Sequence, residues 1–173
     1  MLANMINHPE DKTLFVLVWN KLYRRRLIDD FWFKYRTTQD FDFNFRVYFQ
    51  LKKAIWVHRS LYFYVQRPGS ICHSVDAWTK YYKNRTEMLF NNYQMIPDRM
   101  DNIRHVVLTD LYEFMIALIH DRWNTSERQT TCALCRNYER ITRPDLWYNK
   151  RIHWKTKLQW TLRIMLTIFS ICI

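Results

Sequence analysis

NIRHVVLTDLYEFMIALIH, residues 102–120, is the stretch that most clearly indicates the fold class. Its apolar residues recur at intervals of three and four, which places five of them on one side of a helix: Val107, Leu111, Phe114, Met115 and Leu118. Asp110 and Glu113 lie off that side. The pattern predicts a helix that packs through its apolar face.

Around this stretch the chain is expected to hold more helices and a few short strands. The predicted helices are a short basic one at 21–30, one at 39–53, three within 74–141, and a last one from about 153 to the end, after a basic aromatic connection beyond Pro144. The predicted strands lie at 15–18 and 55–65, and a turn is predicted at 66–70. The expected fold class is therefore α/β and dominated by helices.

Composition excludes several classes of protein. The chain has 173 residues and is 49% hydrophobic, enough for one folded domain with a real core. Gly69 is its single glycine, so neither a Gly-rich dinucleotide fingerprint nor a nucleoside triphosphate loop can be present. The formal net charge of +11 attracts phosphates, nucleic acid or an anionic membrane surface, without choosing among them.

Cysteines and hydropathy predict an intracellular location. Polar residues near the start leave no signal peptide, so the four cysteines, at positions 72, 132, 135 and 172, are expected to be reduced. Cys132 and Cys135 lack a second ligand pair, which argues against zinc. The longest uncharged apolar stretch, Ile164 to Ile173, has ten residues, fewer than the roughly 20 of a spanning helix.

The last predicted helix is amphipathic and basic. One side is expected to carry Leu158, Leu162, Met165, Leu166 and Phe169, and the other Gln159, Arg163, Thr167 and Ser170. Cations and tryptophans alternate at its start: Trp147, Lys150, Arg151, Trp154, Lys155, Lys157 and Trp160. Two interpretations stay open: a helix lying in the interface of an anionic membrane, and a terminal helix packed on the core.

Asp40 and Asp42 look like a metal-binding Asp-x-Asp string, but both lie in a predicted helix, which places them on different sides. Residues two apart lie about 200° around a helix, so these two carboxylates cannot share a cation. Asp42 is expected on a solvent-facing stripe, paired with Arg46 at i,i+4. Asp40 shares its side with Asn44 and is expected to point inward or into a cleft, unless it only complements the helix dipole after a Thr38 cap.

Four motifs in order carry a family resemblance: VWNKLYRR (18–25), QDFDFN (39–44), AIWV (54–57) leading to LYFY (61–64), and QRPGSI (66–71). Together they resemble the C-terminal half of a family 2 glycosyltransferase, of the GT-A fold type used in bacterial capsule, exopolysaccharide and lipopolysaccharide assembly. The resemblance implies an acceptor-side part of that domain at 1–71, a helical extension at 72–145 and a basic amphipathic tail helix at 146–173.

The resemblance also implies roles for individual residues. Asp40 matches the Asp that serves the family as general base in an inverting transfer, although Gln39 stands where the family usually has Glu. Arg67 and Ser70 match a loop near the sugar-nucleotide diphosphate, and the alternative for them is a solvated surface turn. Substrate contacts are further expected from Trp19, Asn20, Lys21 and Asn44, with core packing as the alternative for the first three.

Family members also carry an upstream donor-binding half that ends in the true Asp-x-Asp, which holds Mn²⁺ or Mg²⁺. The sequence starts just before the Trp19 motif, so those metal ligands are not expected here. The implied partners are a nucleotide sugar, a glycan or lipid-linked acceptor, an upstream polypeptide and an anionic membrane. The implied location is the cytoplasm, peripheral at the inner membrane face. The alternative function is a basic module without enzymatic activity, for a membrane surface or nucleic acid, although no nucleic-acid motif is present.

Overall fold

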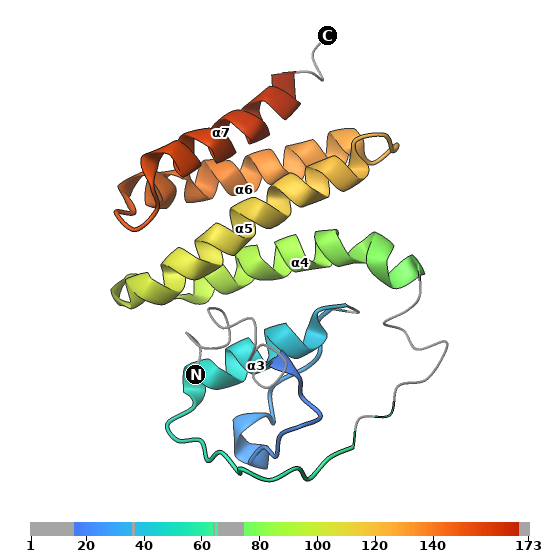
Figure 1. Ribbon diagram of the computed structural model, residues 1–173, viewed down its shortest axis with the longest axis vertical. Helices are drawn as coiled ribbons and strands as arrows, with labels where there is room; N and C mark the ends of the chain where they lie inside the picture. The colour runs from blue at the N-terminus through green and yellow to red at the C-terminus, as the bar shows by residue number, and fades with distance from the viewer. Residues whose placement is uncertain (1–15, 36, 64, 66–74, 170–173) are drawn as a thin grey trace. The chain divides into compact units, whose positions relative to one another are not determined.

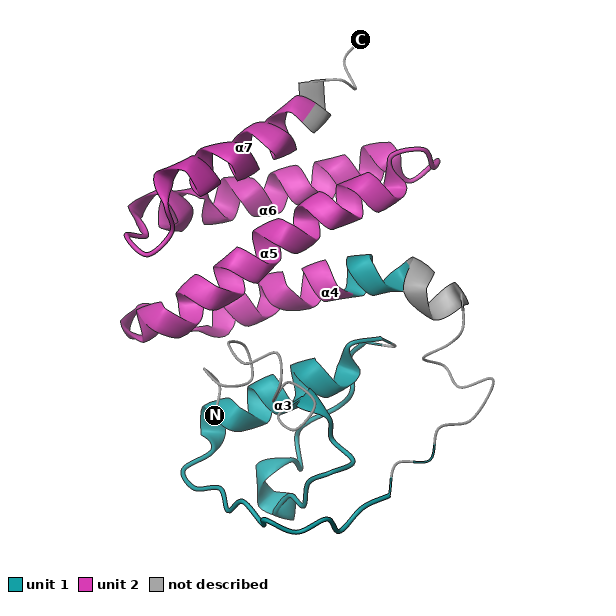
Figure 2. Ribbon diagram, viewed as in Figure 1, with its two compact units in different colours: residues 1–84 teal, residues 85–173 magenta. Residues whose placement is uncertain are grey.

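The computed structural model describes residues 16–35, 37–63, 65 and 75–169 (Figure 1). The chain divides into two compact units, Met1–Asn84 and Arg85–Ile173 (Figure 2). Helix α4, Val75–Met95, begins in the first unit and continues into the second. Each unit has its own set of packed side chains.

Unit 1 is built around helix α3, Gln39–Gln50, which ends three residues before the predicted end. Phe43 is its central buried ring: Tyr23 meets it edge-on at 5.5 Å between centroids, and Phe33 stacks on it at 5.0 Å. Where a basic helix was predicted at 21–30, the structure has the short 3-10 helix η1, Arg25–Leu27. Packed aromatic side chains therefore form the centre of this unit.

The Asp42–Arg46 pair forms, but its predicted exposure to solvent was wrong. Both side chains are buried, and Arg46 donates from Nε and from a terminal nitrogen to Asp42 Oδ2 at 3.0 and 2.8 Å. The guanidinium also donates to the carbonyl of Trp32 at 2.6 Å and lies 5.0 Å from the centre of the Phe31 ring. The loop 31–35 covers this side of α3, which the helical periodicity of α3 alone does not reveal.

The predicted α/β fold class, with an acceptor-side GT-A strand region, is wrong for the described residues, which are helical and contain no strand. Of the first predicted strand, 15–18, Val18 begins a turn that is closed by a hydrogen bond from the Lys21 N–H to its carbonyl at 3.2 Å. Residues 53–63, which include most of the second predicted strand (55–65), are exposed and form no regular secondary structure. The backbone hydrogen bond recorded within 53–63 runs locally, from Arg59 to Val57 at 2.8 Å. A strand exists only when a neighbour accepts and donates its ladder bonds, so β-propensity alone does not form one.

Unit 2 is a stack of long helices (Figure 2). After α4 come the 3-10 helix η3, Asp98–Met100, and the helices α5, Asp101–Arg122, α6, Arg128–Tyr148, and α7, Trp154–Phe169. The predicted helix at 102–120 is confirmed as the central part of α5. Four of its five predicted face residues are buried, and Phe114 is half-buried under the guanidinium of Arg85.

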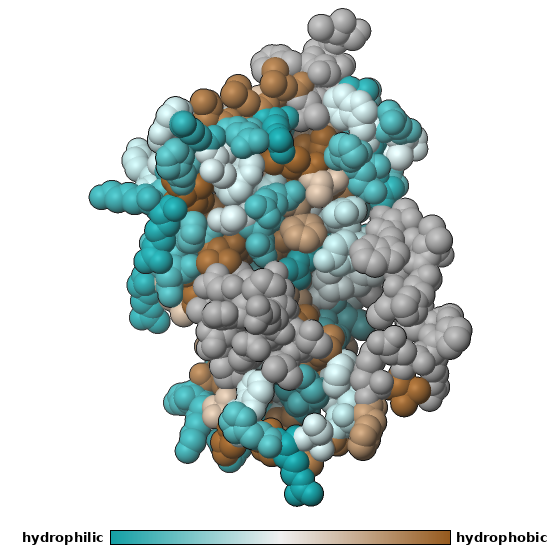
Figure 3. All heavy atoms as spheres, in the orientation of Figure 1, coloured by the Kyte–Doolittle hydropathy of each residue, from teal (hydrophilic) through white to brown (hydrophobic). Residues whose placement is uncertain are grey.

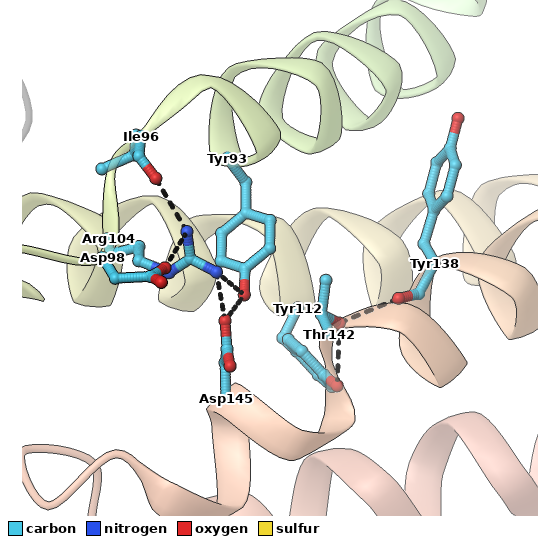
Figure 4. Close-up of polar contacts among 8 residues, drawn as sticks. All are labelled: Tyr93, Ile96, Asp98, Arg104, Tyr112, Tyr138, Thr142 and Asp145. Atoms are coloured by element: carbon cyan, nitrogen blue, oxygen red, sulfur yellow. Dashed lines mark hydrogen bonds and ion pairs between the residues drawn. The ribbon is translucent and has the colours of Figure 1, made fainter.

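Polar contacts also connect the helices of unit 2 (Figure 4). Arg104 of α5 donates to Tyr93 Oη of α4 at 2.9 Å and forms an ion pair with Asp145 of α6, which also accepts a hydrogen bond from Tyr93. Deeper in the unit, the Thr142 hydroxyl donates to the Tyr138 carbonyl of its own helix and is hydrogen-bonded to the Tyr112 hydroxyl at 3.2 Å. These contacts hold α4, α5 and α6 in register.

Helix α6 continues through Pro144, where a connection was predicted. Proline removes one helical hydrogen bond and crowds the preceding turn. Here the turn beyond it is held by Leu146, which is fully buried, and by the Asp145 ion pair with Arg104. Tertiary contacts therefore outweigh the local preference.

In the part of the chain that the structure describes, no helix combines the length and apolar content needed to cross a bilayer.

Candidate functional site

The start of α3 is where the sequence motifs of unit 1 converge. Thr38 is the N-cap residue, as predicted, but its side chain makes no capping hydrogen bond, and its buried hydroxyl has no hydrogen-bond partner among the residues that the structure describes. Its φ of 63° lies in the left-handed region, which is unfavourable for a β-branched residue. Backbone strain of this kind is concentrated at functional sites, and here it sets the direction in which the first turn of α3 begins.

Asp40, in that first turn, is anchored through one of its two carboxylate oxygens. The backbone N–H of Val18 donates to Asp40 Oδ2 at 3.2 Å, across 22 positions of sequence. The side chain is half-buried, and within the described residues its Oδ1 accepts no hydrogen bond. One oxygen thus orients the carboxylate while the other can accept a proton from a bound molecule.

Lys21 lies near this carboxylate and is held by its own turn. Its ammonium donates to the carbonyl of Leu17 and to Asn20 Oδ1, the latter at 2.7 Å. Burial lowers the pKa of Lys21 to about 8, against the opposing effect of the Asp40 charge. A lysine with this pKa is a cation that gives up its proton more readily than a solvated one.

Asn44 lies one helical turn after Asp40 and is fully buried. Its amide donates to the Val16 carbonyl at 2.6 Å, and its Oδ1 accepts a hydrogen bond from Tyr23 Oη, also at 2.6 Å. Burial raises the pKa of Tyr23 well above its usual range, although the hydrogen bond to Asn44 opposes this, so the phenol stays protonated and donates. Asn44 therefore fixes the 16–23 segment against α3, and does not face solvent.

The structure brings together most of the residues predicted for the site. The α3 N-terminal cluster consists of Val18, Lys21, Tyr23, Asp40 and Asn44. Beside it, the Trp19 ring stacks on Tyr62 at 4.6 Å between centroids, which joins the third motif to the first. Two predicted substrate-binding residues, Arg67 and Ser70, lie outside the described residues.

Three members of this arrangement were not predicted as site residues: the Val18 N–H, Tyr23 and Tyr62. Tyr23 and Tyr62 stood inside the motifs that carried the resemblance, which was the available signal. Backbone donors such as Val18 N–H leave no trace in residue identity, so only the tertiary structure could reveal this one.

These residues do not fit a divalent metal. Asp42 is buried on another side of α3, with its Oδ2 bound to Arg46, and Asp40 Oδ2 is bound to Val18. Among the described residues, no group of three or more His, Cys, Asp or Glu side chains lies close enough to hold an ion. Hard cations need several oxygen ligands at once, so no metal-dependent step is assigned to the cluster.

No family model, curated protein sequence or solved structure matches the chain.

Proposed function

We propose that the α3 N-terminal cluster is the acceptor-activating part of a glycosyltransferase of the family 2 type. Asp40 is its general base. The reaction is inverting transfer of a sugar from a nucleotide sugar to a glycan or lipid-linked acceptor, and it requires donor-binding elements that the described residues do not contain. The proposal rests on the four sequence motifs and on the anchored Asp40 carboxylate.

The observation that carries the proposal is the contact between motifs that are far apart in sequence. Asp40 meets the Val18 backbone, Asn44 bonds to Tyr23, and Trp19 stacks on Tyr62. If Asp40 only complemented the dipole of α3, the first and third motifs would not need to lie beside the start of that helix. The stacked rings also offer an aromatic face, the surface on which sugar rings pack.

The chemistry assigned to Asp40 is a single proton transfer. The hydroxyl oxygen of the acceptor attacks the anomeric carbon of the donor sugar, and Asp40 Oδ1 accepts the proton of that hydroxyl. The bond between the anomeric carbon and the diphosphate oxygen breaks, and the diphosphate leaves. Inversion follows from attack on the face opposite the leaving group.

The location proposed with this activity is peripheral, at the inner face of the membrane, where a lipid-linked acceptor would be presented. The net charge of +11 supports an anionic surface as the partner. The alternative function, a membrane-surface module without enzymatic activity, is favoured by one observation, the exposed apolar residues of α7.

The test is a transfer assay on the chain produced together with candidate donor-binding polypeptides from the same genome, with labelled UDP and GDP sugars. In the combination that transfers sugar, Asp40→Asn is expected to lower turnover roughly 100-fold to 10,000-fold, the usual range for a general base. Donor binding should be unchanged, because Asp40 makes no contact that the donor needs in this proposal.

The matched control is Asp29→Asn, an exposed carboxylate of the same unit that pairs with Arg25 at 3.2 Å. This variant should keep full turnover. If Asp40→Asn transfers sugar as fast as the unchanged chain, Asp40 is not the base and the proposal fails.

A further inference from the structure

Helix α7 packs through one face and exposes another that is also apolar. Its packed face stacks Trp160 on Tyr112 at 5.6 Å between centroids and buries Thr161 and Ile164 against α5 and α6. The exposed face carries the α7 stripe, defined as Trp154, Leu158, Leu162 and Leu166, which are 59%, 40%, 45% and 62% exposed. Figure 3 shows the row of hydrophobic side chains along the edge of the molecule where α7 lies.

The rotation of α7 about its axis is fixed by a buried lysine. Lys157 lies on the packed face, and its ammonium donates to the carbonyl of Trp147 at 2.9 Å, near the end of α6. Residues four apart on a helix follow one another along a single row. With Lys157 and Trp160 directed inward, the row that begins at Trp154 is held on the outside.

The charges that α7 itself carries are all positive. No Asp or Glu follows Asp145 in the sequence, whereas five Lys and Arg residues do: Lys150, Arg151, Lys155, Lys157 and Arg163. Of these five cations, which lie beyond α6 or in α7, Arg151 pairs with Asp101 of α5 at 3.3 Å, and Lys157 is buried. Lys155 and Arg163 each follow a stripe residue directly and are exposed. A second copy of the chain would bring these like charges together, so self-association through the stripe is disfavoured.

We infer that the α7 stripe docks on an anionic membrane surface, with its leucines in the outer acyl region and its cations among the lipid phosphates. A leucine row flanked by basic residues, with tryptophan at one end, is the composition of interfacial helices. Because the opposite face stays packed on α5 and α6, the helix docks as part of folded unit 2. This inference deepens the peripheral location proposed above and does not depend on sugar transfer.

Deleting α7 would not test this inference, because it would also remove the buried Trp160 and Ile164 from the core. The stripe variant is therefore Leu158→Gln with Leu162→Gln, in the full chain. Its matched control is Met95→Gln with Ile141→Gln, whose side chains are similarly exposed, at 47% and 43%, on other helices. Circular dichroism and thermal unfolding establish that both variants fold.

The measurement is co-sedimentation with vesicles of phosphatidylcholine alone and with vesicles that also contain phosphatidylglycerol. The unchanged chain should bind the anionic vesicles, the stripe variant should bind them about tenfold more weakly or worse, and the control should bind normally. Lys155→Glu should weaken binding roughly fivefold to thirtyfold on anionic vesicles only, and salt should reduce that difference. Brominated lipids should quench the tryptophan fluorescence of the bound protein. The quenching should be weaker in Trp154→Phe, which lacks the tryptophan of the stripe, than in the control variant Trp32→Phe.

Equal binding by the stripe variant and the unchanged chain would overturn the inference. So would an intact chain that ignores anionic vesicles, or one that forms a stripe-dependent dimer by light scattering instead of binding them. None of these assays contains a sugar nucleotide or an acceptor. Failure here would therefore leave the test of Asp40 unaffected, and loss of the transfer activity would leave the membrane assay unaffected.

Discussion

At the scale of single residues, Asp40 and Asp42 of α3 are expected to differ in how much each contributes to the stability of the fold. Asp42→Asn leaves the buried Arg46 without its charged partner, so the free energy of unfolding should fall by about 3 kcal/mol. Asp40→Asn keeps an acceptor for Val18 N–H and should change this free energy by less than about 0.5 kcal/mol. Urea denaturation of each variant measures both values, and similar losses would contradict the distinction.

The second prediction at this scale concerns the pH dependence of Lys21. Its pKa is about 8 in the folded protein and 10.5 in the reference state, because burial disfavours the charged form. Between these values the unfolded chain binds more protons than the folded chain, so the free energy of unfolding rises with pH. Below about pH 8 both states carry the proton, and the burial penalty is present in full.

The measurement is urea denaturation from about pH 7 to pH 9.5, for the unchanged chain and for Lys21→Met, which should flatten the rise. Higher pH is avoided because burial raises the pKa of Tyr23 and Tyr48, so the stability they contribute is lost as the pH passes their ordinary value. An identical slope in both proteins would show that Lys21 is not the titrating group.

At the scale of elements, the Arg104 cluster predicts which carboxylate connects the helices of unit 2. Arg104 pairs with Asp145, whose side chain is 42% exposed, and with Asp98, whose side chain is 98% exposed. Asp145→Asn also weakens the bond from Tyr93 and should lower the free energy of unfolding by about 1 kcal/mol. Asp98→Asn is the matched control and should not change the melting temperature, since solvent screens that pair. A larger loss for Asp98→Asn would contradict this assignment.

At the scale of the whole molecule, the 173-residue chain should not bind a sugar nucleotide with Mn²⁺ or Mg²⁺ at ordinary affinity. Its single glycine excludes a Gly-rich phosphate loop, and its described acidic residues do not gather into a metal site. Calorimetric titration with UDP and GDP sugars measures this. A basic chain can attract nucleotides through charge alone, so the control is a titration without metal and at raised salt. Tight binding that requires the metal would contradict the prediction.

The sequence by itself determined that α3 and the long helices of unit 2 form, but not where α3 and α6 end. Periods of three and four residues in α5, and the apolar and basic residues of α7, are local properties that a segment carries wherever it lies. It also determined that Asp40 and Asp42 face different directions, because helical geometry depends only on their spacing. The Asp42–Arg46 pair was predicted for the same reason, without its burial.

Only the tertiary structure decided what depends on distant partners. The burial of Arg46 requires the 31–35 loop, and the anchoring of Asp40 requires a backbone N–H that lies 22 positions away. The exposed 53–63 segment has the residues of a strand but no pairing neighbour among the described residues, which local propensity cannot report. Which apolar face of α7 packs and which is exposed was likewise set by α5 and α6, because burial is a relation between elements and not a property of one segment.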